Sequence, residues 1–257
     1  MTTAKKVIME TQPRNESPSV VLVHGGMLGP WTWSDVATLL KQQGLSVYIL
    51  DLPSVGDNPE ETPLGDFYAD VAEIRRVLDQ VRPPVLLCGH SYGGAVITEA
   101  AGGPHPAVAH LVYLTAAIPD RNQTIDEAAE ATEGQTDVLG PLIPVSGPAG
   151  GIVLEPGQAI DALFHDCSKE RAREAASQLR PMNPVVRSQA LTTAAWRDLP
   201  STMVQGSQDR MPAILAPAFL SRDKEIITLP TGHCPNWSHP KLVAELLLSR
   251  AAKIAAA

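Results

Sequence analysis

The sequence predicts an α/β fold: a mostly parallel central sheet with helices on both faces and an inserted cap. Three observations support this prediction. Short apolar runs that fit buried strands alternate with stretches of helical spacing, which is typical of repeated strand–helix units. Turns rich in small residues follow two of these runs, at residues 24–27 and 89–93. The alternation stops at residue 119 and returns at residue 196, so we expect a core of residues 1–118 and 196–257 and a cap insertion of residues 119–195.

Each expected element rests on its own spacing of apolar residues. In the first half, the expected strands are 5–10 at an edge, 19–24, 45–50, 85–88 and 108–118, and the expected helices are 33–43, 63–81 and one beginning near residue 95. In the second half, helical pieces are expected at 159–164 and 169–179 within the cap, then strands at 201–205 and 225–229 and helices at 212–220 and 239–253. Parallel strands joined by helices bring their carboxyl ends to one edge of the sheet.

Composition and charge exclude several classes of protein. The net charge of -8 comes from scattered residues with no basic stripe, so we expect no nucleic-acid partner. No apolar run reaches the length of a membrane span, and the first residues lack the apolar centre of a secretory signal. The three cysteines have neither paired nor metal-ligand spacing. We therefore expect a cytoplasmic protein without a membrane partner, a metal or another cofactor.

The central stretch of the chain is a turn between a strand and a helix, with the sequence GHSYG at residues 89–93. The pattern G-x-S-x-G in that context predicts a sharp turn that presents the Ser91 hydroxyl at the carboxyl edge of the sheet. Flanking β-carbons would collide there, which accounts for the glycines. The alternative is an ordinary glycine-rich turn in which Ser91 caps the helix.

A serine hydroxyl becomes a nucleophile only when a base takes its proton. His233 follows the last predicted strand, at the same sheet edge as Ser91, and Asp209 follows the strand before it. A carboxylate in that place would orient the imidazole, and the chain order Ser91, Asp209, His233 fits this architecture. Asp120, after strand 108–118, is a rival for the orienting carboxylate. A structural histidine and a turn-capping aspartate are the alternatives to these roles.

The HGGM turn after strand 19–24 predicts a second donor for a developing oxyanion. The backbone N–H groups of Gly26 and Tyr92 would converge on one oxygen, with Met27 as the alternative to Gly26. We expect His24 and His90 to hydrogen-bond in the loops beside the nucleophile. A plain glycine-rich turn remains the alternative to an oxyanion hole.

Along essentially its whole length the chain resembles the α/β-hydrolases. The resemblance rests on LVHGG, GHSYGG, GSQDR and TGHCPNWSHP, and the first two of these segments look most like the branch of plant methylesterases, hydroxynitrile lyases and bacterial carboxylesterases that hydrolyse pyrethroids. The resemblance implies the α/β-hydrolase fold, with Ser91 as nucleophile, His233 as general base and Asp209 as orienter. Hydroxynitrile lyases of this branch carry a lysine directly after the catalytic histidine, where this chain has Cys234.

The function that these residues favour is hydrolysis of small apolar carboxylic esters through an acyl-enzyme. Met27, Leu28 and Trp31 are expected to line the pocket from below, and apolar cap residues from above. The cap residues concerned are Ile125, Val138, Leu139, Leu142, Ile143, Ile152, Val153, Leu163 and Phe164. Two alternatives stay open: a lyase or C–C bond hydrolase on the same triad, and a non-catalytic small-molecule receptor. A homodimer is also compatible with the sequence.

Overall fold

The computed structural model describes residues 17–56, 64–132, 144–146, 150–221 and 224–256. Its main sheet has six strands in the order β2-β1-β3-β4-β7-β8, and every neighbouring pair is parallel. The strands are β1 (Ser19–Val23), β2 (Val47–Leu50), β3 (Val85–His90), β4 (Val108–Leu114), β7 (Ser201–Gly206) and β8 (Glu225–Leu229). The predicted strand 5–10 lies outside the described residues.

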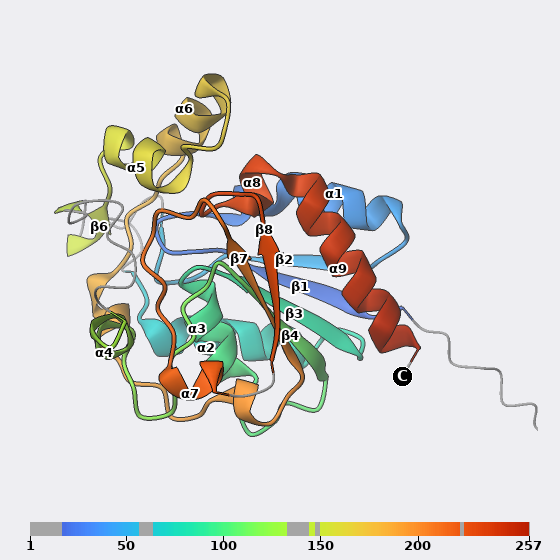
Figure 1. Ribbon diagram of the computed structural model, residues 1–257. Helices are drawn as coiled ribbons and strands as arrows, with labels where there is room; N and C mark the ends of the chain where they lie inside the picture. Colours follow the sequence, from blue (N-terminus) through green and yellow to red (C-terminus); the bar gives the residue numbers. More distant parts are fainter. Residues whose placement is uncertain (1–16, 57–63, 133–143, 147–149, 222–223, 257) are drawn as a thin grey trace, which may run out of the picture.

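Helices cover both faces of this sheet (Figure 1). On one face α1 (Ser34–Gln42) and α9 (Pro240–Ala255) pack over β1, β3, β4 and β7. On the other face α2 (Phe67–Leu78) and α3 (Gly93–Ala100) build the larger apolar cluster. The predicted α/β fold, with a parallel sheet between two helical layers, is confirmed.

The central strand and the helix that follows it are buried on all sides. Every residue of β3 and every residue of α3 is buried, as expected for a strand in the middle of a sheet and a helix pressed against it. Close packing requires glycine at the start of α3. A β-carbon on Gly94 would lie 2.6 Å from the β-carbon of Ala116 and from the carbonyl oxygen of Ala117.

Residues 119–195 contain most of the remaining elements. These are α4 (Ile125–Glu130), the short antiparallel strands β5 (Val145–Ser146) and β6 (Ile152–Val153), α5 (Pro156–Leu163), α6 (Lys169–Ser177) and a 3-10 turn, Pro184–Arg187. Further short elements are 3-10 turns at Pro30–Trp33 and Ala195–Arg197, α7 (Pro217–Leu220) and α8 (Pro235–Ser238). The predicted cap residues Val138, Leu139, Leu142 and Ile143 lie outside the described residues.

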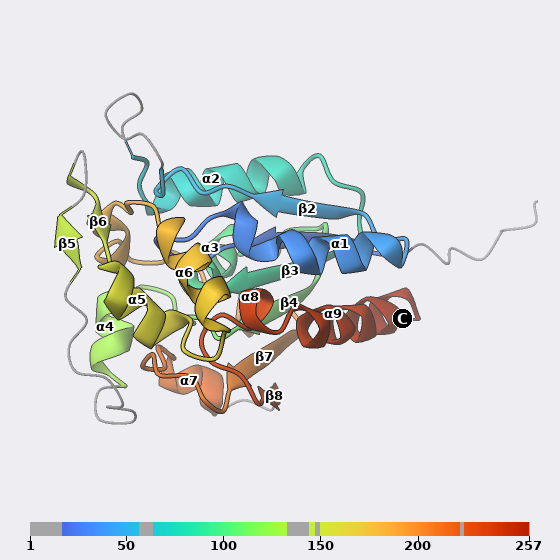
Figure 2. The same cartoon turned by 90° about the horizontal axis from the view of Figure 1, so that it is seen from above.

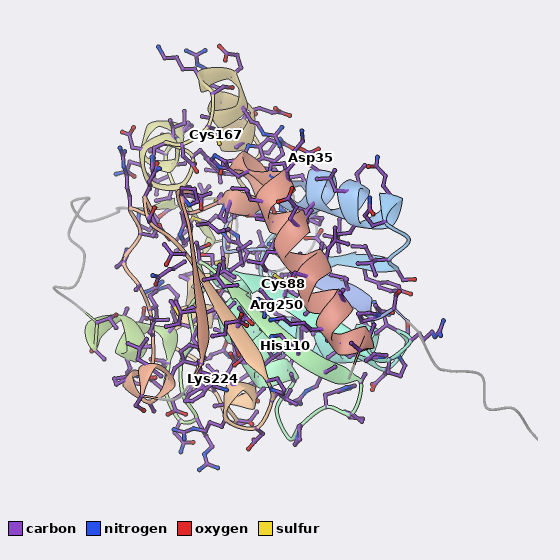
Figure 3. The ribbon with its side chains drawn as sticks, turned by 45° about the vertical axis from the view of Figure 1, so that its right-hand side comes forward. Asp35, Cys88, His110, Cys167, Lys224 and Arg250 are labelled. Carbon is purple, nitrogen blue, oxygen red and sulfur yellow. The ribbon has the colours of Figure 1, made fainter. Side chains whose placement is uncertain are left out.

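We call α5 and α6 the cap helices, because they lie beyond the carboxyl ends of the strands (Figures 1 and 2). They form a separate apolar cluster with Leu28, which lies in the HGGM loop, and Trp237, which lies in α8. A 2.5 Å ion pair between Arg171 of α6 and Asp35 of α1 also ties them down, and Figure 3 shows Asp35 at the end of α1 nearest to the cap. Other residues of the 119–195 segment, such as Ala195, pack into the main core. The boundary between the core and the cap stays a prediction.

Several element ends differ from the predicted ones for identifiable reasons. The helix expected at 63–81 begins at Phe67, because the Asp66 side chain accepts a hydrogen bond from the Ala69 N–H and caps it. The strand expected at 108–118 ends at Leu114, because Thr115 has a φ of 44°. The helix expected at 212–220 is only Pro217–Leu220.

Candidate active site

Ser91 lies in a strained turn between β3 and α3. Its φ is +52°, in the left-handed region that side chains other than glycine seldom adopt. The turn is held by a 3.2 Å hydrogen bond from the Ser91 N–H to the carbonyl oxygen of Leu114. A β-carbon on Gly93 would lie 2.7 Å from the carbonyl oxygen of His24, so the chain passes too close there for a side chain. The strain is therefore sustained by the surrounding packing.

Three predicted side chains meet at this turn. The imidazole Nε2 of His233 lies 3.0 Å from the Ser91 hydroxyl oxygen, and its Nδ1 lies 3.0 and 3.1 Å from the two carboxylate oxygens of Asp209. The three residues follow β3, β7 and β8, so the sheet edge gathers them from distant parts of the chain. The arrangement lets the imidazole accept the serine proton while its other nitrogen donates to the carboxylate.

Asp209 is suited to stay ionised beside the imidazole. Burial alone would raise the pKa of its carboxyl, but the charge of His233 and the hydrogen bonds from His233 and from the Met211 N–H lower the pKa below its ordinary value. The rival carboxylate, Asp120, instead forms an ion pair with Arg197. Asp209 is thus the carboxylate that faces His233 in this structure.

The backbone of His233 is held from below by two hydrogen bonds. Its carbonyl oxygen accepts from the Thr115 hydroxyl at 2.7 Å and from the His90 Nε2–H at 2.9 Å. Burial lowers the pKa of His90 to about 3, so this ring is neutral and donates from Nε2. Thr115 is a β-branched residue with positive φ, a strained conformation that sequence spacing did not predict.

The HGGM loop lies directly against the turn that carries Ser91. A β-carbon on Gly25 would be 2.9 Å from that of Ser91, and one on Gly26 would be 3.6 Å from that of Tyr92. Among the described residues, no acceptor is found for the backbone N–H of Gly26, Met27 or Tyr92. Amides without an acceptor are therefore available beside Ser91, and the choice between Gly26 and Met27 stays open.

Arg180, which follows the cap helices, braces this loop and was not predicted as a site residue. Its Nε–H donates to the Leu28 carbonyl at 3.1 Å, and its backbone N–H donates to the Met27 carbonyl at 2.9 Å. Its guanidinium also pairs with Asp51, at 2.5 Å. Burial would raise the pKa of Asp51, but hydrogen bonds from His24 and Arg180 hold it well below its usual range. The loop is thus tied to the end of β2 through one buried arginine.

The predicted pocket residues take different places. Leu28 and Trp31 pack in the cluster under the cap helices, where the Trp31 ring meets Trp237 edge-on at 4.9 Å between centroids. Met27 contacts both this cluster and the main core. Met182, which sequence reasoning missed, lies over the HGGM loop, with its sulfur 2.5 Å from where a Gly26 β-carbon would be. It belongs to an irregular segment that has no periodic signal.

A buried carboxyl supports the turn from behind. Asp70 accepts 2.6 Å hydrogen bonds from the hydroxyls of Tyr92 and Ser54 and a 2.8 Å bond from the Ser54 N–H. Burial raises its pKa to about 6, against the lowering effect of these hydrogen bonds. Tyr92, the residue after the nucleophile candidate, is therefore anchored to α2.

The described part of the chain holds no cluster of three or more metal-ligating side chains, and none of its helices has the length and hydropathy of a membrane span. The three cysteines are unpaired. Figure 3 shows Cys167 between the cap helices and Cys88 within the sheet. Burial raises the pKa of the Cys167 thiol to about 12 and that of Cys234 well above its ordinary value, so neither is a reactive thiolate.

The parallel sheet and the serine on a strand–helix turn, with a histidine and an aspartate at the same edge, define the α/β-hydrolase class. Comparison with known proteins agrees. The sequence matches the alpha/beta hydrolase family over residues 20–246, and the chain belongs to this family.

Its relatives include plant esterases and bacterial hydrolases. Methylesterase 17 of Arabidopsis thaliana is 23% identical over 96% of each chain, and polyneuridine aldehyde esterase of Rauvolfia serpentina is 28% identical over 63% of this chain and 65% of the relative. Among solved structures, a pyrethroid hydrolase from Sphingobium faniae JZ-2 superimposes with a TM-score of 0.71 at 20% identity, covering 91% of this chain and 97% of that one. The predicted resemblance to methylesterases and to pyrethroid-hydrolysing carboxylesterases is confirmed. The prediction that the chain is a carboxylesterase-type enzyme is confirmed with it.

Proposed function

We propose that this protein hydrolyses carboxylic esters of small apolar substrates through an acyl-enzyme formed on Ser91. The observation that supports the proposal most directly is the hydrogen-bonded chain from the Ser91 hydroxyl through His233 to Asp209, with each bond at 3.0 to 3.1 Å. The family and the esterase relatives supply the reaction class.

In the first step His233 Nε2 takes the proton of the Ser91 hydroxyl as its oxygen attacks the ester carbonyl carbon. The negative charge that forms on the carbonyl oxygen is stabilised by the amides of Gly26 and Tyr92. When the tetrahedral intermediate collapses, the C–O bond to the alcohol breaks. The imidazolium then gives its proton to the departing alkoxide.

In the second step water replaces the alcohol. His233 takes one proton from the water as its oxygen attacks the acyl carbon, and returns that proton to the Ser91 oxygen when the acyl group leaves as a carboxylic acid. Asp209 keeps the imidazole in the tautomer that presents an unprotonated Nε2 to Ser91, and stabilises the imidazolium in both steps. No other group is needed for the balance of atoms and charge.

The side chains around the serine favour uncharged substrates. Met27 and Met182 lie beside the amides, and the apolar cluster under the cap helices is close by. Burial of apolar carbon is worth about 25 cal/mol per Å². We therefore expect kcat/KM to rise by up to about fourfold for each methylene added to the ester until the space is filled.

The test combines turnover with covalent labelling. A series of nitrophenyl esters of increasing chain length is hydrolysed by the wild-type protein, and a fluorophosphonate probe is expected to label Ser91 once per chain. The Ser91→Ala variant should lose the label and nearly all turnover, with a residual rate above that in water. Labelling and turnover that survive Ser91→Ala would refute the proposal.

The alternative functions would give different results in the same experiment. A protein that binds the esters but neither turns them over nor reacts with the probe would be a receptor. Cleavage of cyanohydrins or C–C bonds, with no ester turnover, would indicate the lyase or C–C hydrolase chemistry. Cys234 stands where such lyases carry a lysine and is fully buried. The cytoplasmic location and the homodimer remain predictions.

A further inference from the structure

The loop that carries His233 has no regular structure of its own. Residues 230–234 lie between the end of β8 and the start of α8, outside any helix or strand. The position of the imidazole therefore depends on the hydrogen bonds that hold this loop. The Thr115 hydroxyl and the His90 ring hold the His233 carbonyl from the side of the sheet. What holds the loop from the other side comes from the cap.

Asp166 lies in the turn between the two cap helices and accepts a hydrogen bond from Gly232, the residue just before His233. Its Oδ2 accepts the Gly232 N–H at 2.6 Å and the Ser238 hydroxyl at 2.8 Å, and lies 3.4 Å from the His239 Nδ1. The Asp166 side chain is only 4% exposed, and no donor among the described residues reaches its other oxygen, Oδ1. Burying a carboxylate is costly unless its hydrogen bonds offset the lost hydration. All the hydrogen bonds that the described residues give this carboxylate fall on Oδ2, and they join it to the loop of His233 and to α8.

Cap attachment does not require this carboxylate. The cap helices already share an apolar cluster with Leu28 and Trp237 and are joined to α1 by the Arg171–Asp35 ion pair. A β-carbon on Gly232 would lie 2.9 Å from the Asp166 carboxylate, so the close approach also depends on glycine. The contact with Gly232 therefore acts on the path of the loop, in addition to any part that Asp166 has in attaching the cap.

The same turn also reaches the loop of the orienting carboxylate. The His165 Nε2–H donates to the carbonyl oxygen of Gln208, at 2.9 Å, and Gln208 directly precedes Asp209. Two consecutive cap residues therefore bind the residues that directly precede His233 and Asp209. Both contacts are to the backbone, so they act on the paths of the two loops.

We propose that Asp166 is a positioning residue of the active site: by accepting the Gly232 N–H it sets His233 against Ser91 and Asp209, so that a docked cap completes the triad. The inference rests on the proposed function. Misplacing a catalytic group by about 1 Å costs roughly 100-fold in rate. Loss of this single anchor, with the Thr115 and His90 bonds intact, should therefore lower kcat roughly 10- to 100-fold.

The central experiment compares Asp166→Ala with Asp166→Asn. The alanine variant should show the loss in kcat with KM within about twofold of wild type, because the substrate surface is unchanged. The asparagine variant should recover to within about threefold, because its amide oxygen still accepts the Gly232 N–H. The matched control is Asp35→Ala, which removes another carboxylate that anchors the cap and should leave kcat within about twofold.

A second variant approaches the contact from the other side. Gly232→Ala should push the loop off the carboxylate and lower kcat to a similar extent. It should add little in the Asp166→Ala background, because the contact between Gly232 and Asp166 is already lost there. This variant keeps the proposal testable if Asp166→Ala does not fold.

A readout without turnover separates this inference from the proposed function. Hydrogen exchange at the Gly232 amide, followed by NMR, should be roughly tenfold faster in Asp166→Ala than in wild type and close to wild type in Asp166→Asn. A wild-type protein without esterase activity would refute the proposed function, and the exchange data would then decide whether Asp166 holds the loop. Three results would overturn the inference: unchanged kcat or exchange in Asp166→Ala, no recovery in Asp166→Asn, or an equal loss in Asp35→Ala.

Discussion

Asp70→Asn probes the buried carboxyl that anchors the turn of Ser91 through Tyr92. Asp70 is fully buried, and its pKa is raised from 3.8 to about 6, chiefly by burial. Asparagine has nearly the same shape and keeps an oxygen for the Ser54 N–H, while the hydroxyls of Ser54 and Tyr92 can accept from its amide. The substitution therefore removes the titration while the hydrogen-bonded arrangement is retained.

The direction of the effect follows from proton linkage. A carboxyl whose pKa is higher in the folded than in the unfolded chain binds more protons when folded, so its contribution favours the folded state at low pH and is lost as pH rises through about 6. At about 1.4 kcal/mol per pKa unit the full loss is about 3 kcal/mol, and about 2 kcal/mol of it falls between about pH 4 and pH 7. The free energy of unfolding of wild type relative to Asp70→Asn should decrease by that amount over the range.

The assay is denaturant unfolding of both proteins at several pH values, because the difference between them cancels the other titrating groups. Asp66→Asn is the control on the same helix. Hydrogen bonds from Gln189 and the Ala69 N–H lower the pKa of Asp66. The free energy of unfolding of wild type relative to Asp66→Asn should therefore not decrease over this range. A flat or rising difference for Asp70→Asn would refute the reasoning.

Three further predictions concern the site. Asp209→Asn should lower kcat by roughly 10⁴-fold in steady-state ester hydrolysis, as loss of the orienting carboxylate does in other triads. Asp120→Asn should change kcat by less than about threefold. The reverse ranking would show that Asp120, not Asp209, orients His233. Arg180→Gln should lower kcat by about tenfold with the fluorophosphonate site intact, because the HGGM loop loses the hydrogen bond from the arginine side chain to the Leu28 carbonyl; an unchanged kcat would contradict this. Gly93→Ala should cost about 1 to 3 kcal/mol in denaturant unfolding, because its β-carbon would lie 2.7 Å from the His24 carbonyl oxygen; equal stability would show that the turn can relax.

The sequence alone was sufficient for the fold class and for the location of the candidate site. Alternating strand and helix patterns imply parallel strands, and parallel strands place their carboxyl ends at one edge. Ser91, Asp209 and His233 each follow a strand, so their meeting was predictable from topology. The observed contacts among them match that expectation, although their catalytic roles remain proposals.

Only the tertiary structure decided which groups support that site. Asp120 and Asp209 were both reasonable partners for His233 in the sequence, and the pairing of Asp120 with Arg197 separates them. Asp166 and Met182 come from the segment where periodicity stops, so no pattern pointed to them. Such contacts depend on the paths of irregular loops, which are set by packing and hydrogen bonds between distant residues, whereas local spacing records only which face of a helix or strand is buried.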